Sequence, residues 1–427
     1  MAAPHLGCAV LAAQLAFAAA LLSGCGTDQP RSVIPPRSII VELSAGAKHA
    51  CAAFDDGKLR CWGANNYGQV GQTPRTSIQG QAQTVEHDSV TAPQTVAGLP
   101  SFSGVMAGIT QTCVFASDRS LACWGGIDWA RGPSSPLRYQ GDASYVTPPV
   151  FPIAQLNGIS QASFGARHVC GLVAEGQVAC WGENSAGQLG VNSTEQYPTA
   201  QPTVVPGLPP AVQVAAGTFA SCAVLHDGTV QCWGDNWTGQ GASTVPQIIE
   251  GFTGVAALSM HRHGCARLLD GSVACLGESG EGQAGQVISG PGAFSVDGLA
   301  AATTLAPLQT IDIGGAATQV AVGRTFSCAL RGDQQVLCWG SNAHGQLGRG
   351  VGPDVLALDP APAMVVGLGA VSQLVTGDEF ACALQGGGTL LCWGSNADGQ
   401  LGIGVPAPEF PFDTDDAPHP TPERVSW

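Results

Sequence analysis

Residues 222 to 234 read Cys-Ala-Val-Leu-His-Asp-Gly-Thr-Val-Gln-Cys-Trp-Gly, and this pattern recurs along the chain. Its cysteines lie ten positions apart, a glycine stands two positions after the second, and the residue between is tryptophan in six repeats and Leu276 in the fifth. Seven such pairs use fourteen of the sixteen cysteines. The pairs are Cys51 and Cys61, Cys113 and Cys123, Cys170 and Cys180, Cys222 and Cys232, Cys265 and Cys275, Cys328 and Cys338, and Cys382 and Cys392. Seven copies of one unit at variable intervals predict a repeat architecture.

The segment between the two cysteines has the signature of a β-hairpin. Three repeats contain Asp-Gly there, at residues 56–57, 227–228 and 270–271, with apolar residues on both sides. A tight turn near residue 227 places Cys222 and Cys232 opposite each other on one face, at the separation that a disulfide needs. We therefore expect one disulfide in each hairpin. Reduced buried thiols and a metal site are the alternatives, although nine intervening residues do not match the usual zinc spacings.

Each repeat contains two further runs with the character of strands. A β-rich run that ends in small residues precedes the hairpin, as in Val212 to Gly217. A Gly-Gln-x-Gly turn follows it, as in residues 187–190, but the second repeat lacks this turn and the fourth is irregular there. A short run such as Pro202 to Val205 completes the unit. Four strands per unit are typical of a propeller blade, so residues 40–427 are predicted to form one all-β, seven-bladed β-propeller of four-stranded antiparallel blades.

The repeat resembles that of the regulator of chromosome condensation family. The shared pattern is Gly-x-x-His-x-x-Ala-Leu-x-x-Asp-Gly-x-Val-x-x-Trp-Gly-x-Asn-x-x-Gly-Gln-Leu-Gly. Here its histidine is present only as His49, His168 and His263, and the cysteines occupy positions that vary in the eukaryotic members. The resemblance implies a ring closed by strands from both chain ends that share a blade. Residues 422–425 would then supply the outer strand of the blade that begins with residues 41–46.

The first 24 residues are predicted to be a lipoprotein signal peptide. They contain no Asp, Glu, Lys or Arg, and residues 7–22 form an apolar stretch that is short for a transmembrane helix. The run Leu22-Ser23-Gly24-Cys25 resembles a bacterial lipobox, which would make Cys25 the lipidated first residue of the mature protein. Ordinary secretory cleavage and a retained anchor are the alternatives.

The residues after the lipobox predict where the protein resides. Gly26 resembles an outer-membrane sorting signal, and residues 25–39 have the composition of a lipidated cysteine followed by a short tether. Cys8 would leave with the signal peptide, so that fourteen cysteines remain for seven bridges, which favours an oxidising compartment. We expect a lipid-anchored protein of the outer membrane, on its periplasmic or its surface side.

The charge balance excludes some partners. The 31 acidic and 16 basic residues give a net charge of −15, which disfavours nucleic acid and bare anionic membranes. The family's eukaryotic namesake acts on a small GTPase, but we expect no small GTPase as partner of an extracytoplasmic lipoprotein.

Long insertions separate the Gly-Gln-x-Gly turn from the last strand of most repeats, and they enter each blade at the same point. They should therefore emerge on one rim of the ring, the candidate binding surface. In the second insertion, aromatic and arginine side chains are candidate binding anchors, with simple covering of the ring as the alternative. These residues are Trp129, Arg131, Arg138, Tyr139 and Tyr145.

No catalytic or cofactor-binding motif is present in the sequence. The repeated tryptophans are expected to pack between blades, and the three repeat histidines to make structural hydrogen bonds rather than to bind metal. Asp413, Asp415 and Asp416 lack the glycine and glutamate of a calcium loop. We therefore expect no cofactor, no metal and no enzymatic activity, but a scaffold that binds a macromolecule, most readily a protein. A glycan-binding adhesion module and a propeller hydrolase or lyase are the alternatives.

Overall fold

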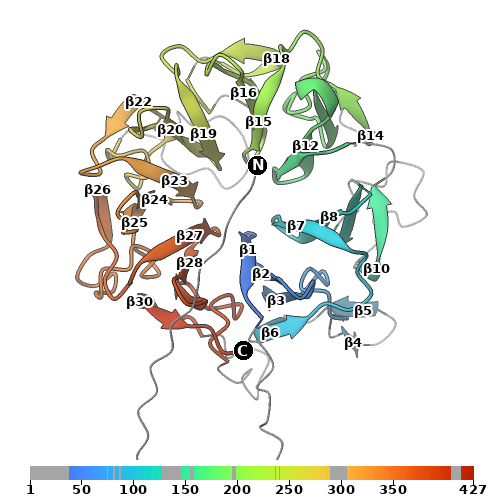
Figure 1. Cartoon of the computed structure of the whole chain (residues 1–427), viewed down its shortest axis with the longest axis vertical. Coiled ribbons are helices and arrows are strands. Elements are labelled where there is room, and N and C mark those ends of the chain that lie inside the picture. The colour runs from blue at the N-terminus through green and yellow to red at the C-terminus, as the bar shows by residue number, and fades with distance from the viewer. Residues whose placement is uncertain are drawn as a thin grey trace, which may run out of the picture. The chain divides into compact units, whose positions relative to one another are not determined.

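Seven four-stranded antiparallel sheets stand around a central axis in the computed structural model (Figure 1). The structure describes residues 38–74, 76–79, 82–85, 88–118, 120–126, 146–153, 158–194, 199–235, 237–239, 241–288, 305–404 and 415–427. The predicted fold class is therefore confirmed. Within these residues, no helix is long and apolar enough to cross a membrane.

Each blade is built from four strands in chain order, and in blade one β4 (Thr76–Gln79) and β5 (Ala82–Val85) lie in the sequence between the third and the fourth. The first three blades, from the innermost strand outward, comprise β1 (Ile40–Ala45), β2 (His49–Phe54), β3 (Leu59–Ala64) and β6 (Ser89–Thr95); β7 (Phe102–Ala107), β8 (Gln111–Ala116), β9 (Leu121–Gly125) and β10 (Val146–Ile153); and β11 (Gln161–Phe164), β12 (His168–Leu172), β13 (Val178–Gly182) and β14 (Thr199–Val204).

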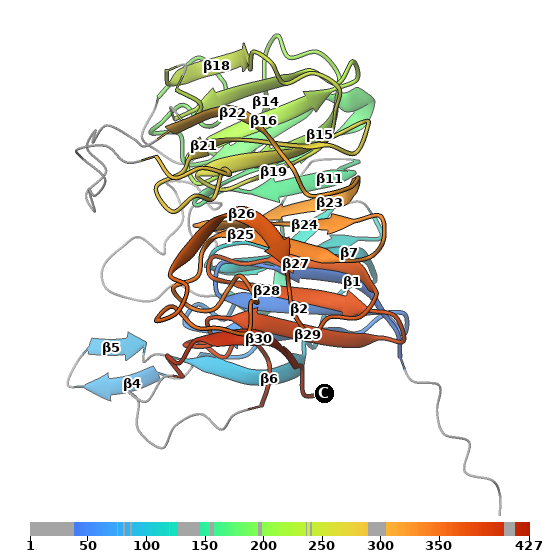
Figure 2. The same ribbon diagram turned by 90° about the vertical axis from the view of Figure 1, so that its left-hand side faces the viewer.

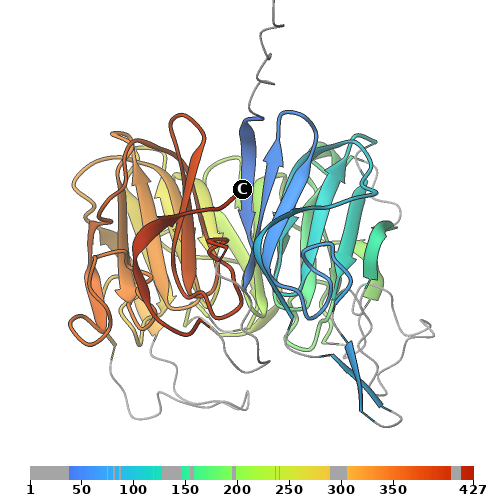
Figure 3. The same cartoon turned by 90° about the horizontal axis from the view of Figure 1, so that it is seen from below.

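Blades four to seven repeat this order. They comprise β15 (Ala211–Ala216), β16 (Ala220–Leu225), β17 (Val230–Gly234) and β18 (Ser243–Ile248); β19 (Val255–Met260), β20 (His263–Leu268), β21 (Val273–Glu278) and β22 (Leu305–Ile311); β23 (Ala317–Val322), β24 (Phe326–Arg331), β25 (Val336–Ser341) and β26 (Leu358–Met364); and β27 (Val371–Thr376), β28 (Phe380–Gln385), β29 (Thr389–Gly394) and β30 (His419–Arg424). A separate hairpin of β4 (Thr76–Gln79) and β5 (Ala82–Val85) projects from one face of the ring (Figures 2 and 3).

A disulfide joins the two middle strands of every blade, as predicted. The register places Cys222 of β16 directly opposite Cys232 of β17, with their Cα atoms 4.0 Å apart. The glycine after each tryptophan is part of the same unit. Gly234 has φ of 101°, and a Cβ atom there would lie 2.4 Å from the carbonyl oxygen of Phe219. The seven bridges join Cys51 to Cys61, Cys113 to Cys123, Cys170 to Cys180, Cys222 to Cys232, Cys265 to Cys275, Cys328 to Cys338 and Cys382 to Cys392.

The repeated tryptophans pack between neighbouring blades, as expected. Trp233 is buried, and its indole Nε1 donates a hydrogen bond of 2.9 Å to the carbonyl oxygen of Gln188 in the Gly-Gln-x-Gly turn of the preceding blade. Each such bond satisfies a buried donor and fixes the spacing of two sheets. The same bond joins Trp62 to Gln400, Trp124 to Gln69, Trp339 to Gln283 and Trp393 to Gln346.

The fifth blade has no tryptophan at the repeat position, and a tryptophan from the fourth blade packs there instead. Leu276 takes the tryptophan position, and the fourth repeat lacks a regular Gly-Gln-x-Gly turn. Trp237, which follows the third strand of blade four, is buried in one apolar cluster with Leu276. Its ring lies so close to Gly264 and Gly277 of blade five that a Cβ atom at Gly264 would be 2.9 Å from it. The preceding blade thus supplies the missing indole.

Replacing Trp237 with alanine is expected to lower the free energy of unfolding by about 3–5 kcal/mol, because it empties a large buried site. Introducing the missing repeat tryptophan with Leu276→Trp should be damaging alone, since Trp237 occupies the space, but should recover stability in the double variant. Urea unfolding of the two single variants and the double variant measures this coupling. Additive losses would show that the two positions do not share one site.

The ring is closed differently from what the resemblance implied. Blade one has its own outer strand, because Thr95 of β6 pairs with Arg60 of β3, so no position is left for a C-terminal strand. β30, which contains residues 422–424, instead completes blade seven, where Arg424 pairs with Leu391 of β29. The expectation of a shared blade was therefore wrong.

Contacts between complete blades close the ring instead. The indole of Trp62 donates to the carbonyl of Gln400 at 2.9 Å, and the amide of Leu43 donates to Oε1 of Gln373 at 3.1 Å. At the outer edge, the ring of Trp427 meets those of Phe54 and Trp62 edge-on, at centroid distances of 5.2 and 5.9 Å. The first and seventh blades are thus joined by the same kinds of contact that join other neighbouring blades, with Trp427 added.

Candidate binding face

The connections from the third to the fourth strand, which include the insertions, begin at the same face in all seven blades, and we call this face the insertion face. The turns between the first and second strands of each blade, such as residues 217–219, lie at this face. In every blade the last residue of this turn accepts a backbone hydrogen bond from the residue that ends or follows the third strand, as in Glu183 N to Arg167 O at 2.9 Å. Because the insertions leave from the ends of the third strands, the predicted common face is confirmed for their starting points.

The opposite face, which we call the hairpin face, carries the turns between the second and third strands. Ser38, which lies just before the first strand, is at this face: its hydroxyl donates to Asp56 at 3.0 Å, and the amide of Ile39 donates to Asp55 at 2.8 Å. The ring therefore starts on the side away from the insertions.

The predicted binding anchors Trp129, Arg131, Arg138, Tyr139 and Tyr145 lie outside the described residues, as does Cys25. The structure does describe the insertion of blade six.

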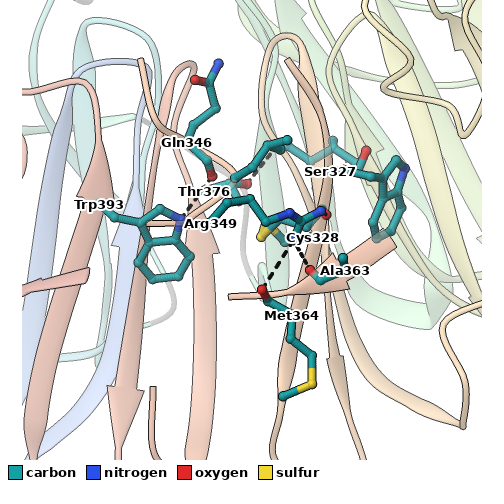
Figure 4. The surroundings of a disulfide bond; sticks show 12 residues. Ser327, Cys328, Gln346, Arg349, Ala363, Met364, Thr376 and Trp393 are labelled. Atoms are coloured by element: carbon teal, nitrogen blue, oxygen red, sulfur yellow. Dashed lines mark hydrogen bonds between the residues drawn. A yellow bond between two sulfur atoms is a disulfide. The ribbon is translucent and has the colours of Figure 1, made fainter. Parts of the chain in front are cut away.

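In the insertion of blade six, Arg349 holds the first residues against the blade (Figure 4). Its guanidinium donates to the carbonyl of Cys338 at 2.7 Å and also to that of Ala363. Burial lowers the pKa of Arg349, against the opposing effect of Asp359.

Polar and charged side chains near the mouth of the central channel form contacts between blades. Lys48 of blade one contacts Asp398 of blade seven at 3.0 Å, and His261 of blade five contacts Asp378 of blade seven at 3.2 Å. Burial opposes the ionisation of Asp378, but the hydrogen bond with His261 and the nearby charges, including that of Arg324, outweigh it and hold the pKa of Asp378 below its usual value. The side chains near the mouth therefore join blade one to blade seven and blade five to blade seven.

Two arginine–glutamate ion pairs lie on the insertion face away from the channel mouth. Arg167 contacts Glu183 at 3.3 Å, and Arg262 contacts Glu278 at 3.4 Å. The arginine side chains of both pairs are about half exposed. Exposed pairs of this kind contribute little to stability, so they leave the face free to exchange these contacts for contacts with a partner.

The central channel encloses a cavity of about 350 Å³ between the innermost strands. Side chains of one blade reach the free backbone edge of the next and act as ties. Gln213 accepts from the amide of Leu258 and donates to its carbonyl, both at 2.8 Å, and Ser163 accepts from the amide of Ala216 at 2.9 Å. These ties satisfy backbone groups that would otherwise face the channel.

Blade one carries a carboxylate, Glu42, at the position of these glutamine ties, where it accepts from the amide of Val105 at 3.0 Å. Burial raises the pKa of Glu42, while this hydrogen bond lowers it to a smaller extent. A raised carboxyl pKa means that ionised Glu42 weakens the fold at neutral pH, and that this cost disappears when the group is protonated.

Glu42→Gln is expected to raise the free energy of unfolding by about 1 kcal/mol at pH 7, because the amide avoids burying a charge and can donate as Gln213 does. The gain should shrink as the pH falls through the raised pKa of Glu42 toward the ordinary glutamate value, and should be absent below that value. Chemical denaturation at pH 7 and pH 4 tests this, with Gln213→Glu as the reverse substitution, expected to destabilise. A loss of stability in Glu42→Gln at pH 7 would contradict the interpretation.

The three repeat histidines are buried and connect pairs of blades. Nε2 of His168 lies 2.8 Å from Oγ of Ser221 in the next blade, and this hydroxyl donates to the carbonyl of Gln188 at 2.9 Å. Because the hydroxyl proton goes to Gln188, Nε2 is the donor to Ser221. Burial lowers the pKa of each histidine to about 3, so all three are neutral. The equivalent sets are His49, Thr112 and Gln69, and His263, Ser327 and Gln283.

The histidine bonds are structural, as the sequence predicted, but they reach the neighbouring blade. The acidic run near the C-terminus is also partly structural. Asp415 accepts from Asn396 at 2.7 Å and lies 3.0 Å from Nε2 of His419, whereas Asp413 lies outside the described residues. Across the described part of the chain, no group of three or more His, Cys, Asp or Glu side chains could hold a metal ion.

Comparison with known proteins agrees with the repeat pattern. Models of the regulator of chromosome condensation repeat match residues 40–69, 159–188, 211–240, 317–346 and 371–400, and residues 175–224 and 333–384. The ultraviolet-B receptor UVR8 of Arabidopsis thaliana is 28% identical over 388 residues, which cover 87% of this chain and 80% of the receptor.

Solved structures share the fold. Human WBSCR16 aligns with a TM-score of 0.67 and 22% identity over 87% of this chain and 95% of that chain. Prp20p from Saccharomyces cerevisiae, described with its binding to Gsp1p and histones, aligns with a TM-score of 0.67 and 18% identity over 86% of this chain and 85% of that chain. At these identities the structural likeness establishes the fold alone.

Proposed function

The chain belongs to the regulator of chromosome condensation repeat family, and from this premise we propose that it is a non-catalytic scaffold that binds a protein with its insertion face. The observation that carries the proposal is the emergence of variable insertions at one face of a ring whose other parts follow a fixed repeat. A rigid frame with variable loops at one end is the usual arrangement of a binding surface. Prp20p, a solved structure of the same fold, has been described with its binding to Gsp1p and histones, which supports the same class of function.

We further propose that Cys25 is lipidated and attaches the protein to the outer membrane. Ser38 lies on the hairpin face, so a tether that precedes it would join the ring opposite the insertion face. Cys25→Ser should move the protein from the membrane to the soluble fraction, and continued membrane attachment would contradict lipid anchoring.

Affinity capture of the full-length, oxidised protein from the detergent-solubilised envelope of its source organism tests the binding function. We expect a recurrent protein, identified by mass spectrometry, whose recovery falls when the β4–β5 hairpin, residues 76–85, is replaced by a short Gly-Ser turn. Replacing Asp227-Gly228 on the hairpin face with Asn-Gly is the matched control and should leave recovery unchanged. Capture of polysaccharide alone would instead support the glycan-binding alternative, and capture of nothing would reject the proposal.

A further inference from the structure

The junction between blades two and three lacks the ties that join the other blades. Gly104 and Met106 of β7 occupy the positions of Gln161 and Ser163 in blade three, and neither can accept a backbone hydrogen bond through its side chain. As a result, no hydrogen bond joins blade two to blade three among the residues that the structure describes. Each of the other six junctions has at least one such bond.

The buried part of this junction also lacks hydrogen-bond acceptors for two side-chain donors. The indole Nε1 of Trp181 and the side-chain Nε2 of Gln111 are buried donors that have no partner within the described part of the chain. In other blades the carbonyl of the Gly-Gln-x-Gly turn accepts from the tryptophan, but the second repeat has no such turn. Val169 stands where blade four has Ser221, so no hydroxyl is available to Gln111 either. What remains is apolar packing, which includes Met106, Val169 and Trp181.

The missing ties leave β11 with a free edge toward the channel. Ser163 pairs with Cys170 of β12, and the amide of Gly165 donates to His168, so the alternating amides of Ala162 and Phe164 point away from β12. The corresponding amides in blade four, those of Val214 and Ala216, are bonded to Gln161 and Ser163. All four residues of β11 are half-buried, whereas Val214, Ala215 and Ala216 are buried.

The described innermost strands differ in how many ties they receive. β11 alone lacks both ties, because Gly104 and Met106 provide neither, while each of the others keeps one or two. The free edge borders the 350 Å³ cavity, whose wall includes Ala45, Ala107, Ala215 and Ala321. The cavity therefore offers two adjacent backbone donors among small apolar side chains.

We propose that this edge of β11 binds an extended peptide segment of a protein partner. Two amides two residues apart on a strand are separated by about 6.6 Å, which is the spacing of the carbonyl groups i and i+2 of another extended chain. The partial positive charges of these N–H groups are complementary to such carbonyls, and the alanine wall suits small side chains. Strand addition to a free sheet edge is an established mode of peptide binding. The proposal rests on the proposed function in that the partner is a protein.

The test uses the full-length oxidised protein and the probe acetyl-tetraalanine-amide. Titration followed by amide NMR should shift Ala162 and Phe164 saturably at millimolar probe and slow their hydrogen exchange. Met106→Ser restores the serine tie to Phe164 and should weaken probe binding about tenfold, the effect of losing one hydrogen bond. Met364→Ser makes the same substitution on the outer strand β26 of blade six, away from the cavity, and should leave binding unchanged.

A second variant keeps the test decisive if Met106→Ser fails to fold. Gly104→Gln should tie Ala162 instead and weaken the probe to a similar extent, although the Glu42 carboxylate must shift to make room, since a Cβ atom would lie 3.0 Å from it. Unchanged Ala162 and Phe164 signals at saturating probe would overturn the proposal. So would equal weakening by Met106→Ser and Met364→Ser. If affinity capture finds a protein partner while the probe does not bind, the scaffold function stands and only the channel edge is rejected.

Discussion

Reduction of the seven disulfides is expected to unfold the ring at neutral pH. Each bridge closes a loop of similar length, as the separation is ten positions in every pair. Restriction of the unfolded chain by such a loop corresponds to about 3 kcal/mol, and seven separate loops correspond to about 20 kcal/mol. This exceeds the net stability of most folded domains. The bridges therefore decide whether the ring is folded.

Guanidinium unfolding followed by circular dichroism, with and without a strong reductant, measures this effect. The cysteines of all seven bridges are buried, so reduction must be completed in denaturant before refolding is attempted. The double variant Cys222→Ser and Cys232→Ser should lose about 3 kcal/mol and remain folded, which separates the effect of one bridge from that of seven. A fully reduced ring that refolds with its oxidised stability would contradict the account.

Acidification is expected to destabilise the ring through its three inter-blade histidines. Their pKa of about 3 in the folded protein lies below the ordinary value of 6.5. Between these values the unfolded chain binds more protons than the folded one, so stability is complete above pH 6.5 and falls as the pH decreases toward 3. Each histidine lowers the free energy of unfolding by up to about 1.4 kcal/mol for each pH unit of acidification, so the three together lower it by up to about 4 kcal/mol per pH unit. The lowered pKa of Asp378 acts in the same direction.

The chain offers its own control for this prediction. Blade six has Phe326 at the histidine position, and the following blade has Ala381 at the hydroxyl position. The double variant His168→Phe and Ser221→Ala copies this arrangement and should remove about one third of the pH dependence of urea unfolding between pH 7 and pH 5. A slope unchanged from that of the wild type would show that His168 is already protonated in the folded ring.

The spacing of cysteines predicted the blades and their disulfides because hairpin pairing is a local property of the sequence. Ring closure depends on which strand fills the last place in a sheet. The family resemblance predicts the C-terminal strand for this place in blade one, but Ser89–Thr95 fills it. The C-terminal strand therefore completes blade seven instead.

Contacts between blades were harder to predict, since they join residues far apart in sequence. His168 and Ser221 are separated by 53 positions, and no local pattern links them. A signal existed nevertheless: Thr112, Ser221 and Ser327 stand one repeat after each repeat histidine, and repeats without this histidine are not followed by such a hydroxyl. Trp237 is a similar signal: it is an additional tryptophan just after the fourth repeat, and the fifth repeat has Leu276 in place of its tryptophan.

The sequence predicts on which face of the ring the insertions begin, but not which side chains on that face would contact a partner. Insertions that begin at equivalent positions must start on one side of a propeller, and the turn hydrogen bonds confirm this. The chemistry of a binding face depends on loop side chains that no repeat constrains. The free edge of β11 was not anticipated, although the absent Gly-Gln-x-Gly turn of the second repeat marked the same junction.

Amine-directed cross-linking to the captured partner tests the central claim most directly, because the sequence has two lysines and they lie on opposite faces. Lys48 belongs to the insertion face and Lys58 to the hairpin face, and both side chains are more than half exposed. We expect cross-links from the partner to Lys48 that disappear in Lys48→Arg. Cross-links that instead join the partner to Lys58, and persist in Lys48→Arg, would show that the protein binds through its other face.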